Sequence, residues 1–189
     1  GENSVEALRS HEAIGIFYNQ NNRSASAIRH LTKARQLEEQ NDIEREESLL
    51  IAVETAEAYI NIRTEKKAEN QRNFNNAEKI LSEWADEEIE NPMLRYRRDL
   101  CFARINYNKG KIEESIQKYE EAWQSLDEAN DGEEKAETAT LFYELARVYE
   151  YDEQRKKSVE YFQKAYDIYK KLEMEEEAQE IEQYLPTEE

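Results

Sequence analysis

The sequence predicts an all-α protein, and three observations support this fold class. Apolar residues recur at spacings of three and four along most of the chain, which is the period of an amphipathic helix rather than of a strand. The 189 residues include only four glycines and two prolines, too few for the turns of a β-sandwich or barrel. Aromatic residues make up 10% of the chain and are spread throughout it, which distinguishes it from a disordered polyampholyte despite 37% charged residues.

The first four helices are predicted from the polar breaks between apolar segments. Clusters of Asn, Asp, Ser and Gly mark these breaks because such residues tolerate non-helical backbone and hydrogen-bond to nearby amides. These clusters occur at residues 21–24, 40–42 and 70–76. Residues 64–72 either extend the third helix or form a loop. The predicted helices are residues 5–20, 24–39, 43–63 and 73–88.

The last five helices follow from the same signals. The chain breaks at Asn91-Pro92, at residues 108–110 and 130–132, and at Tyr151-Asp152. The final segment places its apolar residues on one face, as expected of a helix that caps the preceding pair; these residues are Met174, Ala178, Ile181 and Leu185. The predicted helices are residues 92–108, 111–128, 133–151, 154–171 and 174–185.

A fourfold internal repeat runs through these helices. A small residue recurs in the first helix of each pair, at Gly15, Ala56, Ala103 and Ala146. The second helices carry a triplet at positions 0, +4 and +7, namely Ala27-Leu31-Ala34, Ala77-Leu81-Trp84, Ser115-Tyr119-Ala122 and Ser158-Phe162-Ala165. Small residues remove bulk where one helix crosses another, and the large central residue fills the groove beside the crossing.

This pattern resembles the tetratricopeptide repeat (TPR) family. The second-helix triplets begin 50, 38 and 43 residues apart, whereas the plain family repeat has about 34, so the resemblance is to the branch with repeats of about 40 residues. It implies one domain over residues 1–189, a right-handed α-α superhelix of about four helix pairs (about 5–39, 43–88, 92–128 and 133–171) with a cap at 174–185. Trp84 replaces a small residue, so either the second pair is splayed or the register there differs by one turn.

The residues that usually carry catalysis or bind metals are scarce. His11 and His30 are the only histidines, neither lies in a zinc-binding motif, and His11 is expected on a polar helix face rather than in a metal site with Glu12. Cys101 lies among apolar residues and is expected to be a buried small hydrophobe. Residues 127–134 are acidic but lack the ligand spacing of a calcium loop, so a solvated turn is expected. We therefore expect no enzyme activity, no cofactor and no metal.

The charge of the chain limits its partners. With 26 basic and 44 acidic residues the net charge is −18, which argues against binding to nucleic acid. The given sequence has no apolar run long enough to insert into a membrane and no signal peptide, so a cytoplasmic location is expected. The acidic charge is uneven: residues 1–40 are neutral overall, whereas residues 173–189 hold eight glutamates and no basic residue.

The resemblance implies a binding surface on the first helices of the pairs, which line the concave groove of such arrays. The positions that face this groove in the third and fourth pairs include Arg97, Leu100, Arg104, Tyr107, Tyr143 and Arg147. Arginine can bind a carboxylate through two parallel hydrogen bonds, and tyrosine offers rigid contact area. Alternatively, Arg104 and Arg147 form ion pairs with glutamates of neighbouring helices, such as Glu57, Glu144 or Glu150.

Two functions fit this surface. The first is a non-enzymatic scaffold or adaptor that binds a peptide or helix of a partner protein, including one with acidic groups. The alternative is a sensor module, similar to the bacterial peptide receptors of the family, in which a short signalling peptide changes the curvature of the superhelix. Family members that clamp a peptide's terminal carboxylates use lysine and asparagine where this chain has Glu12 and Ile16, so that clamp is not expected.

Overall fold

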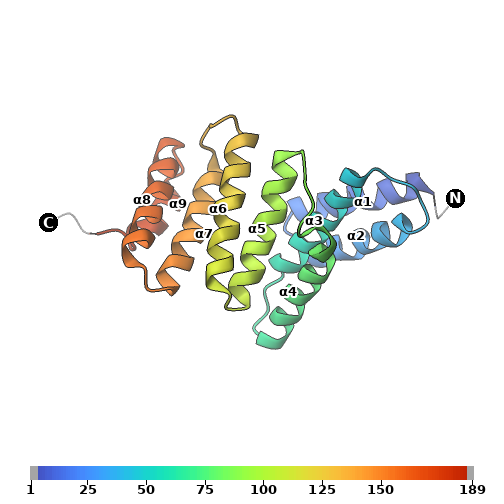
Figure 1. The fold of residues 1–189 in the computed structure, drawn as a ribbon, viewed down its shortest axis with the longest axis horizontal. Coiled ribbons are helices and arrows are strands. Elements are labelled where there is room, and N and C mark those ends of the chain that lie inside the picture. The colour runs from blue at the N-terminus through green and yellow to red at the C-terminus, as the bar shows by residue number, and fades with distance from the viewer. Residues whose placement is uncertain (1–3, 187–189) are drawn as a thin grey trace. The chain divides into compact units, whose positions relative to one another are not determined.

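The computed structural model describes residues 4–186, and within this range it is all-α, as predicted (Figure 1). It has nine α-helices and one short 3-10 turn, and no strand among the described residues. The helices are α1 (Val5–Gln20), α2 (Ser24–Glu38), α3 (Arg45–Asn61), α4 (Lys67–Leu81), α5 (Pro92–Asn108), α6 (Ile112–Ala129), α7 (Ala136–Tyr151), α8 (Arg155–Lys171) and α9 (Glu175–Glu182); the 3-10 turn η1 is Ser82–Trp84.

The chain divides into two compact units, Gly1–Ile89 and Glu90–Glu189. In the first unit, α1 packs on α2 and α3 on α4; in the second, α5 packs on α6, α7 on α8, and α9 covers α8. These are the predicted helix pairs and the predicted cap, in which Ala178 and Ile181 are buried. That the two units form one domain stays a prediction.

Small residues at the helix crossings allow the close packing of the pairs. Gly15 of α1 is buried against α2, and a Cβ added there would lie 2.5 Å from Cγ of Leu31, well inside van der Waals contact. In the second unit, the hydroxyl of Ser115 on α6 donates a hydrogen bond to the carbonyl of Ala103 on α5, at 2.8 Å. The roles predicted for Gly15, Leu31 and Ala103 are therefore confirmed.

Five helices end in the same backbone turn. In each, one residue adopts a left-handed conformation, with φ between 51° and 74°, and the next amide donates to a carbonyl five residues earlier, at 2.8–2.9 Å. This is the Schellman motif, which satisfies carbonyls at a helix end. The left-handed residues are Asn22, Gly110, Asp131, Glu153 and Glu173, which follow α1, α5, α6, α7 and α8.

The predicted bounds of the fourth helix are wrong. α4 spans Lys67–Leu81 rather than 73–88, so residues 67–72 begin this helix, and only 62–66 connect it to α3. Asn70 does not break the chain: its side chain accepts a hydrogen bond from the amide of Thr64 and donates one to the carbonyl of Thr64, which closes the loop. Burial of Phe74, Ala77 and Leu81 holds the Asn-rich stretch helical, because packing outweighs the weak intrinsic preference of asparagine.

Trp84 lies in η1, beyond the end of α4, rather than at a helix crossing. It is 1% exposed, and the guanidinium of Arg45 lies 3.7 Å from the centroid of its ring. Arg45 also forms two hydrogen bonds to Glu87, of 2.9 and 2.7 Å. The chain thus accommodates the large side chain by ending α4 before it.

Substitution of Gly15 by alanine tests the close crossing. The added methyl group collides with Leu31, so we expect Gly15→Ala to lower the free energy of unfolding by about 1–3 kcal/mol despite the better helix propensity of alanine. Urea denaturation followed by circular dichroism measures this change. Ala13→Gly, on the exposed side of the same helix, is the control for intrinsic propensity. A Gly15→Ala protein more stable than the parent would contradict the close crossing.

Candidate functional site

The residues predicted to bind a partner all lie on α5 and α7 of the second unit. The side chain of Asn91 caps α5 by accepting hydrogen bonds from the amides of Met93 and Leu94, at 3.1 and 3.2 Å, and Pro92 follows at the first helical position. We call the surface formed by Arg97, Arg104, Tyr107, Tyr143, Arg147 and Tyr151 the α5–α7 face.

Leu100 and Arg97 differ in what they offer to a partner. Leu100 is 8% exposed and belongs to the hydrophobic core of the second unit, so it presents little surface. Its neighbour Arg97, on the same helix, is only partly buried. Leu100 therefore has too little accessible side chain to contact a partner, and we leave this residue out of the α5–α7 face.

Arg104 is held within the second unit by a polar node that we call the Glu144 node. Its Nε and Nη2 donate to the two oxygens of Glu144, at 2.8 and 2.6 Å, and the hydroxyl of Tyr119 donates to the same carboxylate at 2.9 Å. Burial alone would lower the pKa of Arg104, but the charge of Glu144 outweighs it and raises that pKa. Burial also raises the pKa of Tyr119, so the phenol stays neutral and remains a donor.

The Glu144 node ties α5, α6 and α7 together. Arg104 and Glu144 each keep about a quarter of their side-chain surface exposed, at 23% and 24%. The node is thus an internal ion pair, which is the alternative that the sequence predicted for Arg104. Arg104 therefore positions the helices rather than presenting an unpaired charge.

Tyr143 and Arg147 on α7 meet a residue from the end of the capping segment. The hydroxyl of Tyr184 accepts a hydrogen bond of 2.7 Å from Nη1 of Arg147, and its ring stacks on Phe162 with centroids 4.4 Å apart. The ring of Tyr143 makes an edge contact with Tyr184, with centroids 6.4 Å apart. Arg147 also lies 3.4 Å from Glu150 and keeps 45% of its side chain exposed, so part of this cation remains accessible.

Two exposed tyrosines mark the other end of the α5–α7 face. Tyr107, near the end of α5, is 38% exposed, and Tyr151, the last residue of α7, is 65% exposed. Their rings meet edge to face with centroids 5.7 Å apart. Large aromatic side chains held against one another in solvent offer rigid contact area to a partner.

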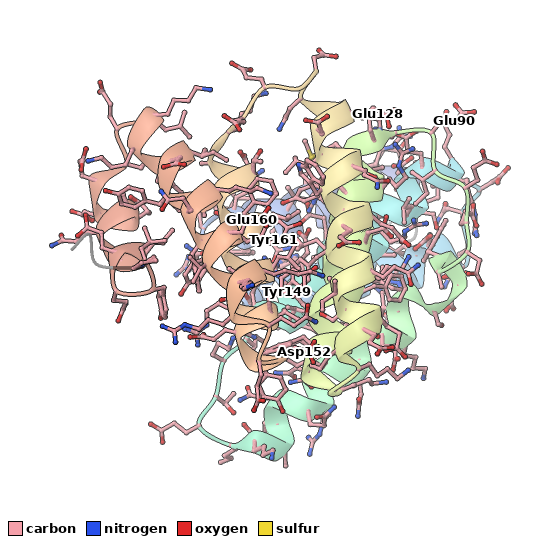
Figure 2. All side chains as sticks on the ribbon, turned by 60° about the vertical axis from the view of Figure 1, so that its left-hand side comes forward. Glu90, Glu128, Tyr149, Asp152, Glu160 and Tyr161 are labelled. Carbon is pink, nitrogen blue, oxygen red and sulfur yellow. The ribbon has the colours of Figure 1, made fainter. Side chains whose placement is uncertain are left out.

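A different side of α7 is closed by a row of aromatic rings. Consecutive rings lie 5.5–5.7 Å apart, and Tyr149 stacks on Tyr161 (Figure 2). The ammonium of Lys164 lies 4.5 Å from the centroid of Tyr161. We call these four rings, Trp123 of α6, Phe142 and Tyr149 of α7 and Tyr161 of α8, the ring cluster; they fill the space between α6 and α8.

The two histidines meet in the first unit. Nδ1 of His11 on α1 lies 3.0 Å from Nδ1 of His30 on α2, so one ring must donate and the other accept. Burial, followed by the nearby His30 and Lys33, lowers the pKa of His11. His11 is partly exposed on its helix, and its contact with His30 across two facing helices was not predicted.

Three further observations concern chemistry and membranes. Cys101 is 1% exposed, which confirms its prediction as a buried residue. Among residues 4–186 no three His, Cys, Asp or Glu side chains are grouped so as to hold a metal ion. No helix in this range is long and apolar enough to cross a membrane.

Comparison with known sequences and structures agrees with this geometry. The sequence model of the tetratricopeptide repeat family matches residues 99–171. Residues 99–171 are tetratricopeptide repeats. Among curated proteins, no sequence matches the chain.

The TPR-like fold extends over nearly all of the chain. A solved structure of a Podosopora anserina protein assigned as a kinesin light chain with nearly identical TPR-like repeats superposes with a TM-score of 0.58. A single-substitution variant of that protein gives 0.59. In both comparisons the sequences are 19% identical, and the match covers 94% of this chain and 86% of the other. The repeats predicted from the sequence are thereby confirmed as TPR-like.

Tyr151 and Tyr184 contact predicted binding residues, and the sequence did not predict either contact. Tyr151 was predicted to end the helix 133–151, as it does in α7, but the position of its ring beside Tyr107 was not predicted. The cap was predicted from its apolar face, to which Tyr184 does not belong by spacing. The available signal was an aromatic residue near the end of the predicted capping helix, since partly buried rings often anchor chain ends to a core.

Removing the charge of Glu144 tests the polar node. Glu144→Gln leaves Arg104 partly buried without its ion partner, so we expect the free energy of unfolding to fall by about 2 kcal/mol. Glu150→Gln, which alters the exposed pair with Arg147, should change it by less than about 0.5 kcal/mol. Chemical denaturation of both variants measures the difference, and equal effects would show that the node adds nothing beyond a surface pair.

The histidine pair predicts a pH dependence of stability. The pKa of His11 in the folded protein lies below its ordinary value of 6.5, so the unfolded chain binds a proton more readily. The stability contributed by the neutral pair is therefore present above pH 6.5 and lost as the pH falls below it. We expect the stability difference between the parent and His11→Gln to shrink from neutral to mildly acidic pH, as measured by thermal unfolding. A difference independent of pH would contradict this.

Proposed function

We propose that this chain is a non-enzymatic protein–protein interaction scaffold, whose second unit binds a segment of a partner protein on the α5–α7 face. Proteins built from tetratricopeptide repeats typically bind other proteins, and residues 99–171 belong to that family. The proposal assigns this kind of binding to named residues of α5 and α7.

The exposed pair Tyr107 and Tyr151 carries the proposal. These rings are 38% and 65% exposed, yet each is held by the other and by the end of a rigid helix. Tyrosine binds at a low cost in side-chain entropy and offers both an apolar ring and a hydroxyl group. Apolar side chains of the partner would pack against these two rings.

Arg97 and Arg147 would recognise acidic groups of the partner beside the two rings. Arg147 of α7 is better placed than Arg97 of α5 to contact an acidic group. Nearly half of its side chain is exposed, and Glu150 is its only close carboxylate among the described residues. Arg104 would act indirectly, since the Glu144 node fixes the spacing of α5 and α7.

Substitution of the two tyrosines tests the proposal. Partners captured from the native source with the parent chain are identified by mass spectrometry, purified and titrated against the variants. We expect Tyr107→Ala combined with Tyr151→Ala to weaken binding at least about tenfold, since central aromatic contacts dominate interfaces. Tyr166→Ala, a partly buried tyrosine of α8, is the matched control. Unchanged affinity of the double variant, with unchanged circular dichroism, would overturn the assignment to this face.

The same titration separates the scaffold from the sensor alternative. A sensor predicts that a short peptide suffices for binding and changes the radius of gyration, measured by small-angle scattering. A scaffold predicts binding without such a change.

A further inference from the structure

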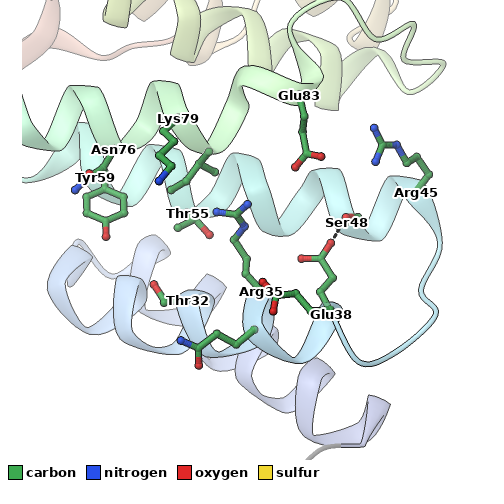
Figure 3. Close-up of a pocket in the computed structure, with 13 residues that line it drawn as sticks. Thr32, Arg35, Glu38, Arg45, Ser48, Thr55, Tyr59, Asn76, Lys79 and Glu83 are labelled. Carbon is green, nitrogen blue, oxygen red and sulfur yellow. Dashed lines mark hydrogen bonds between the residues drawn. The ribbon is translucent and has the colours of Figure 1, made fainter.

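The first unit has a groove at the place where the second unit has its ring cluster. This groove lies between α2 and α4, with α3 as its floor, and has a volume of about 650 Å³ (Figure 3). We call it the α2–α4 groove. It lies in a different unit from the α5–α7 face, so its function can be tested independently of the proposed function.

The repeat explains why the groove is open. Aligned on the repeated triplets and small residues, α2, α3 and α4 correspond to α6, α7 and α8. Tyr59 then corresponds to Tyr149, but the other three rings of the cluster are replaced. Arg35 stands in place of Trp123, Ala52 in place of Phe142 and Ile80 in place of Tyr161. The loss of three rings leaves space that the second unit fills with its own side chains.

Two basic side chains face each other across the middle of the groove. Figure 3 shows Arg35 of α2 and Lys79 of α4 reaching from opposite walls toward Thr55 on the floor. In the described part of the chain, neither side chain forms a hydrogen bond or an ion pair. Exposed cations such as Arg29 and Lys67 also form no ion pair within residues 4–186, but Arg35 and Lys79 differ from them in lining one groove from facing walls.

The end of the groove beside Ser48 has the opposite charge. Glu38 of α2 accepts a hydrogen bond from Ser48, and the carboxylate of Glu83, beyond α4, points toward it (Figure 3). Arg45 lines this end as well, but its guanidinium is engaged by Glu87 and Trp84. Within residues 4–186 no basic side chain forms an ion pair with Glu38 or Glu83. Burial raises the pKa of Glu38 and the charge of Glu83 adds to this effect, although the hydrogen bond from Ser48 and the charges of Arg35 and Arg45 oppose it.

The groove therefore presents a basic centre and an acidic end on one continuous surface, and within residues 4–186 no ion pair closes either of them. Two like charges facing each other in a recess disfavour the empty site, and an opposite charge placed between them removes that repulsion. A guanidinium and an ammonium group on opposite walls can both donate to one carboxylate through charge-assisted hydrogen bonds. A cation beside the glutamates would complete the pairing at the other end.

We propose that the α2–α4 groove is a second binding site, which takes a segment of a partner protein carrying a carboxylate side chain and a basic side chain. The carboxylate lies between Arg35 and Lys79, and the basic group lies beside Glu38 and Glu83. The space left by the missing rings receives the apolar parts of the segment.

Selection of peptides on the full chain tests this site. A phage-displayed library of random peptides is panned on the parent protein in two parallel selections. One selection contains an excess of the Tyr107→Ala/Tyr151→Ala protein as competitor, which lacks only the α5–α7 contacts, and the other contains no competitor. We expect the competitor to remove the groove-binding peptides, since its groove is intact, and these peptides to share one acidic and one basic residue at a fixed spacing. Absence of such a class would overturn the proposal.

Charge variants then locate the bound peptide. For a synthetic peptide of this class, Arg35→Gln combined with Lys79→Gln should raise the dissociation constant at least about tenfold, because two charge-assisted hydrogen bonds are lost. Arg29→Gln combined with Lys67→Gln removes the same charge from exposed positions of the same two helices and should change it less than about twofold. Equal effects of the two double variants would mean that only net charge attracts the peptide and would overturn the site.

A filled groove gives a test that leaves all charges in place. Ile80→Tyr restores the ring that Tyr161 supplies in the second unit and should weaken peptide binding without loss of helical circular dichroism.

Inorganic phosphate distinguishes the source of the anion. Displacement of the peptide by phosphate at the concentration of the peptide itself would assign the basic centre to phosphate instead of a side-chain carboxylate. A selection that yields only peptides whose binding depends on Tyr107 and Tyr151, and none that depends on Arg35 and Lys79, would support the α5–α7 face and overturn the groove.

Discussion

The close crossing of paired helices is the constraint on which the rest of the structure depends. Leu31 occupies the space beside Gly15 so closely that a single methyl group does not fit there. In the second unit, the hydrogen bond from Ser115 to the carbonyl of Ala103 requires a comparably short distance between α5 and α6. Because the pairs are this tight, side chains on the remaining faces of each first helix are presented at fixed positions, where they can form the Glu144 node or meet solvent.

Side-chain chemistry differs between the two units although their helix packing follows one pattern. In the second unit, α7 is enclosed by polar contacts on one side and by the ring cluster on another. In the first unit, the position of the ring cluster is a groove lined by charged groups of both signs. A repeat architecture permits this difference, because each helix pair depends mainly on its own crossing and its immediate neighbours.

The fold could be predicted from the sequence because its determinants are periodic and local. Gly15 and the three alanines at the same repeat position predict the pairing without any knowledge of three-dimensional contacts. The connection from α3 to α4 could not be predicted, since it lacks the left-handed turn that ends five other helices and its asparagines become helical only through packing of Phe74. The site was less predictable for a physical reason: whether Arg104 is paired depends on Glu144, forty residues away in the sequence.

The Schellman turns have a consequence for how far such a sequence can diverge. Their defining bonds join main-chain atoms, as between the amide of Gln154 and the carbonyl of Tyr149, so they place few demands on side-chain identity. Asparagine, aspartate, glutamate and glycine all occupy the left-handed position in this chain. Substitutions at these corners can therefore change the side chain while the main-chain hydrogen bonds that redirect the chain from one helix to the next stay in place.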